Sequence, residues 1–141
     1  MTAAEATVKE GGVIIMLAKS NDGHGGEGFY RSLRDCTSPA DHFAQCVATP
    51  QHKTIPDQWE SQILARILMK HHVIFVSRPE MQNTLREMKL DYAPTLEAAM
   101  AKARILKGEE ASVTIIPNGI SVIVKEITYY GLRKRVPAPA R

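Results

Sequence analysis

The feature that most constrains the fold is a strand-like run followed by a glycine-rich loop, within residues 11–30. The run Val13–Lys19 is apolar at every position but the last and begins with β-branched residues. Such a run predicts a strand buried on both faces, as in a sheet covered by helices. Turn-forming residues 20–23 follow, and the sequence Gly-His-Gly-Gly-Glu-Gly then leads into a helical pattern. Ligands of open α/β sheets usually bind at the carboxyl ends of the strands, so this loop is the first candidate functional site.

The rest of the chain alternates helical and strand-like patterns. Capping residues and apolar spacing predict helices at residues 3–9, 27–36, 39–47, 58–70 and 96–106, and one that starts at Pro79 with Met81, Leu85 and Met88 inward. A second buried strand is expected at residues 72–77, and an Asn-Gly turn predicts a β-hairpin of Ser112–Ile116 and Ile120–Val124. This order predicts a single α/β domain with a mixed, mostly parallel sheet flanked by helices and a C-terminal β-hairpin as its antiparallel edge.

Composition supports one domain and argues against several classes of protein. The 141 residues are 44% hydrophobic, enough for a single core, and they contain no apolar run of about 18 residues that could cross a membrane. The N-terminus lacks the pattern of a secretory signal, so we expect a cytoplasmic protein whose Cys36 and Cys46 stay reduced. The net charge of +3 is uneven, with a basic Pro/Ala tail at residues 133–141. Because aromatic residues make up only 6% of the chain, we interpret this tail as a solvated end and expect no nucleic-acid binding.

The loop contains a G-x-G-x-x-G pattern formed by Gly23, Gly25 and Gly28. A dinucleotide site would also need a second strand with an acidic tip about 20 residues further on. The next predicted strand begins only near His72, so a nicotinamide or flavin site is not expected. Two interpretations of the loop remain: backbone N–H groups that bind a phosphate or carboxylate, or a turn that is merely tight.

Three polar residues of the loop and one tryptophan are further candidates. Asp22, His24 and Glu27 could act as acid, base or ligand-orienting groups. Structural explanations compete, since Asp22 suits an Asx-turn and Glu27 suits a helix start. Trp59, the only tryptophan, lies at a helix start after a polar loop, so it could pack in the core or form the wall of a ligand site.

Four potential metal ligands, Cys36, His42, Cys46 and His52, lie close together in the sequence. Their spacing is not that of a paired zinc motif, and the chain between them is predicted to be helical. We therefore expect no metal site here, and we interpret Cys46 as a small buried apolar residue.

Most of the chain, from about Gly11 to Gly119, resembles one known family. The resemblance is carried by GGVIIMLAKSNDGHGGEGFY, by DQWESQILARILMKHHVIFVS, and by YAPTLEAAMAKA with the later VTIIPNG. These segments look like the C-terminal domain of the nickel-dependent lactate racemases and related 2-hydroxyacid racemases and epimerases. The D-G-x-G loop after a G-G-x-I-I strand is the most specific part, and the spacing to the D-x-W helix and the P-N-G turn agrees as well.

The resemblance implies an enzyme of two α/β domains with the active site in the cleft between them. It implies a nickel-pincer nucleotide attached to a lysine, and a histidine that removes the hydroxyl proton while hydride passes from the substrate carbon to the cofactor and back to the opposite face. The lysine, the nickel-binding histidine, the catalytic histidines and the family's Gln-x-x-Lys substrate clamp have no counterpart in this sequence. No catalytic residue and no metal ligand are therefore expected in this chain, and the residues expected to face the substrate cleft are Asp22, Gly23, His24, Gly25 and Trp59.

We therefore expect residues 1–132 to be the cleft-closing C-terminal domain of a 2-hydroxyacid racemase or epimerase, inactive without its N-terminal cofactor-binding domain. The expected partners are that domain, in the same or another chain, and a small 2-hydroxy acid; membranes are not expected. Either the chain is an excised domain of a longer enzyme, which is the simpler account, or it is a stand-alone subunit. A homodimer of the isolated domain could cover the apolar surface left by the missing half. The alternative is a non-catalytic α/β module that binds an anionic metabolite or a partner protein through the Asn21–Gly28 loop.

Overall fold

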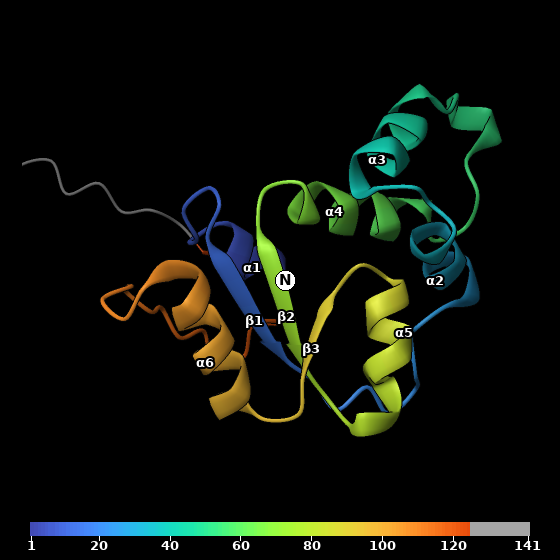
Figure 1. Ribbon diagram of the computed structural model, residues 1–141. Helices are drawn as coiled ribbons and strands as arrows, with labels where there is room; N and C mark the ends of the chain where they lie inside the picture. Colours follow the sequence, from blue (N-terminus) through green and yellow to red (C-terminus); the bar gives the residue numbers. More distant parts are fainter. Residues whose placement is uncertain (125–141) are drawn as a thin grey trace, which may run out of the picture.

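A three-stranded parallel sheet forms the centre of the computed structural model, which describes residues 1–124 (Figure 1). Its strands are β1 (Val13–Leu17), β2 (His72–Val76) and β3 (Asp91–Ala93), in the order β1-β2-β3. The register pairs Val13 with His72 and Ile74 with Asp91. Because all three strands run in one direction, their carboxyl ends meet at one edge of the sheet, at the bottom in Figure 1.

Helices cover both faces of the sheet. On one face Ile14 and Val73 pack with side chains from α2, α4 and α5, and on the other Ile74 and Ala93 pack with Ala99 of α6. Alternate residues of each strand are thus buried in opposite directions, which explains why the strands are apolar almost throughout. The helices are α1 (Thr2–Glu5), α2 (Glu27–Arg34), α3 (Pro39–Ala48), α4 (Gln58–Leu68), α5 (Gln82–Glu87) and α6 (Leu96–Lys107), with 3-10 turns η1 (Gln51–Lys53) and η2 (Pro79–Met81).

The helix boundaries follow the capping signals of the sequence. Ser38 Oγ accepts a hydrogen bond from the Asp41 N–H at 3.1 Å, and Thr95 Oγ1 accepts one from the Ala98 N–H at 3.2 Å. Gly108 ends α6 with a φ of +86°, a conformation that glycine adopts without strain. The predicted α/β domain is confirmed, and so is the burial of Met81, Leu85 and Met88.

The predicted mixed sheet is wrong, because every strand pair in residues 1–124 is parallel. The third strand, β3, was missed by the sequence analysis. Its three residues are too few to show either an alternating pattern or a continuous apolar run. The first strand also ends earlier than predicted, at Leu17, and the first helix ends at Glu5.

The predicted C-terminal β-hairpin is also wrong. Residues 109–124, which we call the arm, contain no strand. The turn at Asn118 does form, with the Ser121 N–H donating to the Asn118 carbonyl at 3.0 Å, but the flanking segments do not pair with each other or with the sheet. Two short strands are marginally stable unless they pack against another layer, and the described residues supply none for the arm.

The basic tail at residues 133–141 and the preceding residues 125–132 lie outside the described part of the chain. Within residues 1–124 there is no helix with the length and apolar character needed to span a membrane.

Candidate functional site

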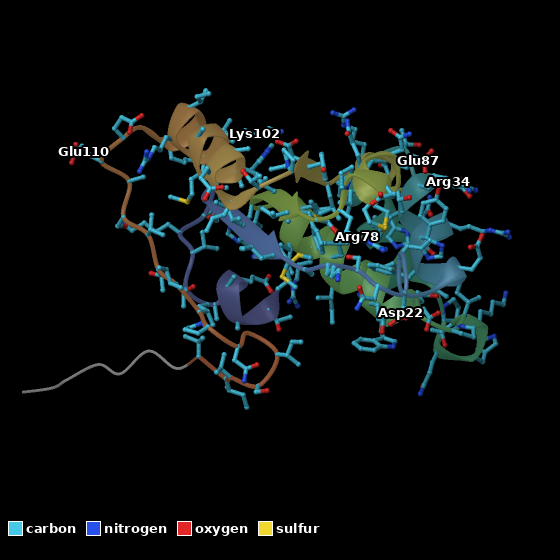
Figure 2. The ribbon with its side chains drawn as sticks, turned by 90° about the horizontal axis from the view of Figure 1, so that it is seen from below. Asp22, Arg34, Arg78, Glu87, Lys102 and Glu110 are labelled. Carbon is cyan, nitrogen blue, oxygen red and sulfur yellow. The ribbon has the colours of Figure 1, made fainter. Side chains whose placement is uncertain are left out.

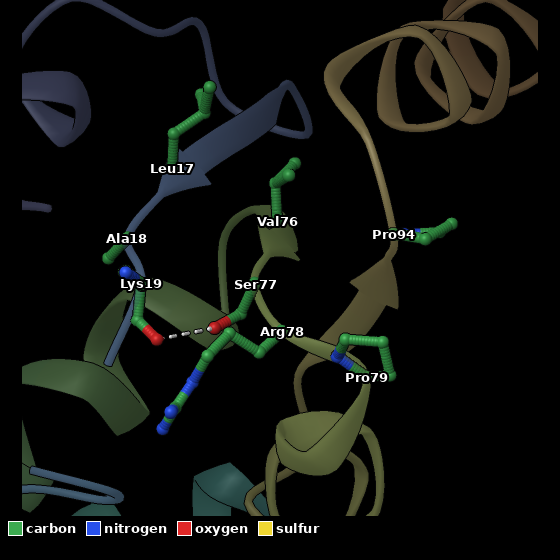
Figure 3. Close-up of a pocket in the computed structure, with 8 residues that line it drawn as sticks. All are labelled: Leu17, Ala18, Lys19, Val76, Ser77, Arg78, Pro79 and Pro94. Carbon is green, nitrogen blue, oxygen red and sulfur yellow. Dashed lines mark hydrogen bonds between the residues drawn. The ribbon is translucent and has the colours of Figure 1, made fainter. Parts of the chain in front are cut away.

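An open pocket lies at the carboxyl edge of the sheet (Figure 3). Two of its residues, Lys19 and Arg78, are cationic, and most of the others are apolar. Such an edge suits a small organic anion. The pocket has a volume of about 490 Å³ and is lined at the end of β1 by Leu17, Ala18 and Lys19, at the end of β2 by Val76, Ser77, Arg78 and Pro79, and after β3 by Pro94.

Arg78 connects this pocket to the glycine-rich loop. Its Nη2 donates a hydrogen bond to the Ser20 carbonyl at 2.9 Å, and Ser77 Oγ donates to the Lys19 carbonyl at 3.4 Å. The Nε–H of Arg78 is buried and has no hydrogen-bond partner among residues 1–124. Ser20 has a φ of +54°, so the chain turns sharply as it leaves β1. Arg78 and Lys19 were not predicted as site residues, although their positions at the ends of predicted strands could have marked them.

The backbone of the loop is exposed where it turns. Gly23 and Gly25 have φ values of +71° and +90°, conformations that side-chain-bearing residues rarely adopt, and both are exposed. Asp22 precedes them and is exposed as well. Figure 2 views the molecule from below, and therefore onto the carboxyl edge, with Asp22 and Arg78 labelled. The structure thus brings the predicted cleft residues 22–25 to the edge where the strands end.

His24 is held in a fixed orientation. Its imidazole stacks on Tyr30 with ring centroids 4.7 Å apart, and its Nδ1 lies 3.1 Å from the Gly26 carbonyl. A carbonyl can only accept, so this contact suits an Nδ1–H that donates to it, and Nε2 lies 3.5 Å from the Glu27 carboxylate. The Tyr30 hydroxyl in turn donates to Glu87, and this hydrogen bond raises the pKa of Tyr30 above its ordinary value. The ring of His24 is therefore braced against α2.

Trp59 lies in the first turn of α4 and is 63% exposed. The loop packs against the two residues before α4: a Cβ at Gly26 would lie 3.1 Å from Asp57 Oδ2, and one at Gly28 would lie 3.4 Å from the Pro56 carbonyl. Packing in the core, one of the two interpretations of Trp59, is therefore not what the structure shows. The residues that precede α4 therefore pack against the glycine-rich loop.

The four potential metal ligands are placed in other roles. His42 Nε2 lies 2.9 Å from Ser61 Oγ and 3.4 Å from Cys46 Sγ, with His42 and Cys46 buried one turn apart on α3. Burial lowers the pKa of His42 and raises the pKa of Cys46, which favours the neutral form of both. Cys36 donates to a backbone carbonyl and His52 is exposed. In the described part of the chain, no three His, Cys, Asp or Glu side chains are grouped so that they could hold a metal ion.

The fold and this edge define a class of protein: an α/β domain that gathers a glycine-rich loop and two cations at the carboxyl edge of a parallel sheet, and that carries an exposed tryptophan in the first turn of α4. The family model of the lactate racemase C-terminal domain matches residues 1–124. The chain belongs to that family, which confirms the resemblance seen in the sequence.

Lactate racemases of two bacteria are similar to the chain. The lactate racemase of Lactiplantibacillus plantarum is 55% identical over 125 residues, and that of Thermoanaerobacterium thermosaccharolyticum is 43% identical over 126 residues. The structure of the lactate racemase apoprotein from Thermoanaerobacterium thermosaccharolyticum matches with a TM-score of 0.86 at 42% sequence identity. Each comparison covers 89% of this chain but only 30% of the relative, so the chain spans less than a third of the length of these proteins.

Proposed function

We propose that this chain is the cleft-closing C-terminal domain of a nickel-pincer-nucleotide-dependent 2-hydroxyacid racemase or epimerase, and that it is inactive alone. The observation that carries the proposal is the exposed Trp59 in the first turn of α4, a helix whose preceding residues Pro56 and Asp57 pack against the glycine-rich loop, in a domain of the lactate racemase family. Leaving a large aromatic ring in water forgoes the free energy of burying it. A role as one wall of a cleft that a second domain completes accounts for this exposure.

The carboxyl edge suits the chemistry of a small 2-hydroxy acid. Such a substrate carries a carboxylate and a hydroxyl on a small carbon skeleton. Lys19 and Arg78 supply positive charge at this edge, and the ring of Trp59 supplies an apolar surface for the substituent on the substrate carbon. In this proposal the domain binds and encloses the substrate, and the residues that face the cleft are Asp22, Gly23, His24, Gly25 and Trp59.

The nickel-pincer nucleotide is implied by the family, but the described residues do not fit a nickel site. The imidazole of His42 and the thiol of Cys46 contact each other, yet both are buried and no third ligand joins them within residues 1–124. The proposal therefore assigns cofactor binding to the remaining part of the enzyme. This chain's own contribution is to exclude water from the closed cleft and to orient the substrate.

Reconstitution tests the proposed function. The Lactiplantibacillus plantarum relative, truncated to remove the matched region and loaded with its cofactor, is mixed with this chain, and lactate racemisation is measured. We expect activity from the mixture and none from either part. Trp59→Ala should lower kcat/KM by about tenfold or more, equivalent to about 1.4 kcal/mol of lost transition-state stabilisation.

Met69→Ala is the matched control, because Met69 is an exposed apolar residue that follows the opposite end of α4. It should leave kcat/KM unchanged. A mixture without racemase activity would refute the proposed function, whereas unaltered kinetics in Trp59→Ala would remove only Trp59 from the site.

A further inference from the structure

We propose that the arm, residues 109–124, is the segment through which this domain docks onto the rest of a racemase, by adding an extended strand to one of its sheet edges. This inference rests on the proposed function, because it takes the partner to be the part of the lactate racemases that the chain does not cover. The partner is thus the cofactor-binding part of the enzyme and not a second copy of this chain.

The arm carries β-branched apolar side chains that face solvent. Ile115 is 82% exposed and Ile120 is 95% exposed, and neither belongs to a buried cluster. Burying one such side chain contributes about 1.5–3 kcal/mol, so an uncovered series of them is unfavourable in water. Contiguous exposed apolar surface of this kind marks an interaction site. The series continues through Val113, Val122 and Ile123, which are also exposed.

Few backbone groups of the arm are hydrogen-bonded to other backbone groups of residues 1–124. Within its described residues, two backbone N–H groups donate to backbone carbonyls: Ala111 to Gly108 at 3.4 Å, and Ser121 to Asn118 at 3.0 Å. The remaining backbone groups on both sides of the Asn118 turn make no backbone hydrogen bond to residues 1–124. Apolar β-branched residues on an unpaired, extended backbone are what β-strand addition requires.

The arm lies outside the packed body of the domain. Figure 2 shows it beyond the end of α6, with Glu110 labelled near its start, running along the outer side of the molecule past α1. An ion pair of Arg104 with Glu109, at 3.5 Å, holds only its start. Docking the arm on a partner would therefore leave the sheet and its helices unchanged.

The family match and its coverage point to the partner. The match extends to residue 124, so the arm is part of the family's domain and not an appendage to it. The relatives are more than three times as long as the matched region, and their remaining polypeptide is available to cover the arm. The turn at Asn118 supports the same view: it forms as the Asn-Gly sequence predicts, but its flanking segments form no strand within residues 1–124.

The test measures binding separately from activity. This chain is titrated into the truncated Lactiplantibacillus plantarum racemase by calorimetry, and amide hydrogen exchange of the arm is followed in the mixture. We expect saturable binding with new protection of the arm amides. The double variant Ile115→Asp/Ile120→Asp should weaken binding by about tenfold or more, because two buried charges replace apolar contacts. Val47→Asp, a substitution of an exposed apolar residue on α3, should change binding by less than about twofold.

Each contrary result has a distinct meaning. If the wild-type chain binds and restores activity but the double variant binds equally well, the arm inference is overturned and the proposed function stands. If the wild-type chain neither binds nor restores activity, both are overturned. The arm could instead become protected because the chain self-associates. In that case the molecular mass would rise with concentration in the wild type but not in the double variant, and the assignment of the partner would be overturned.

Discussion

β2 and the arm are two β-branched apolar segments with opposite surroundings. Both are rich in valine and isoleucine, and Asn-Gly turn chemistry in the arm favours a hairpin. Ile74 of β2 is 0% exposed, lies between two parallel strands and packs with Ala99 of α6, whereas Ile115, Ile120 and Ile123 of the arm face solvent. The difference shows that strand preference produces a strand only where a neighbouring edge and an apolar layer are available.

The largest expected effect tests this contrast directly. Ile74→Ala should lower the free energy of unfolding by about 2–5 kcal/mol, because it leaves a cavity between the sheet and α6. Ile115→Ala, the same chemical change in the arm, should alter it by less than about 0.5 kcal/mol. Urea unfolding of the 141-residue chain followed by circular dichroism measures both. Equal losses in the two variants would mean that the arm is packed in the free chain.

A smaller effect is expected from adding one methyl group at a packed position before β1 and at an open position in the arm. A Cβ at Gly12 would overlap the Val8 side chain and lie 2.8 Å from the Lys9 carbonyl, so Gly12→Ala should cost about 1–3 kcal/mol. The nearest atom to a Cβ at Gly119 of the arm is Ile116 Cγ2 at 3.9 Å, so Gly119→Ala should be tolerated. Melting temperatures of the two variants check the prediction, and a marked loss for Gly119→Ala would argue for a tightly constrained arm.

The smallest effect concerns an ion pair that attaches α6 to the sheet. Lys102 Nζ lies 2.6 Å from Asp91 Oδ1, and His72 Nε2 lies 3.4 Å from Asp91 Oδ2. Burial raises the pKa of Asp91, but the hydrogen bonds from Lys102 and His72 and the charge of Lys102 outweigh it, so the pKa lies below its ordinary value. The stabilisation is therefore present above the unfolded-state pKa of about 3.9 and is lost as the pH falls through the lower folded-state value.

Asp91→Asn should accordingly reduce stability at neutral pH by no more than about 1 kcal/mol, since the pair is partly exposed, and should flatten the loss of stability below about pH 4. Unfolding free energies measured from neutral to acidic pH test this. Glu110→Gln in the arm is the control, because Glu110 makes no ion pair within the described residues. A pH profile for Asp91→Asn that matches the wild type would show that the pair contributes nothing.

Much of the fold could be predicted because its signals are local. Ser38 and Thr95 start helices at the expected positions, and the two long apolar runs became β1 and β2. β3 could not be predicted, since three residues give no pattern and its pairing with β2 comes from a distant part of the chain. The hairpin was predicted wrongly because its local signals, an Asn-Gly turn at Asn118 and β-branched flanks, are present in the sequence. Within residues 1–124, however, no arm residue belongs to a buried cluster that could stabilise it.

The candidate site was found in part. The glycine-rich loop was predicted from its position after a buried strand, and the structure places it at the carboxyl edge. Arg78 was missed because its position after a predicted strand does not show that it reaches the Ser20 carbonyl, far away in the sequence. The exposure of Trp59 was left open for a similar reason, because an apolar residue at a helix start suits a core and a cleft equally well.

The sequence by itself determined the α/β class, the family, the caps of the helices and the position of the glycine-rich loop. These features depend on contacts and conformational preferences within a few residues, which the amino-acid pattern encodes directly. The tertiary structure decided which apolar segments are buried, which cations reach the carboxyl edge, and that Trp59 and the arm remain uncovered. Burial depends on which distant segments come together, and a local pattern contains no information about them.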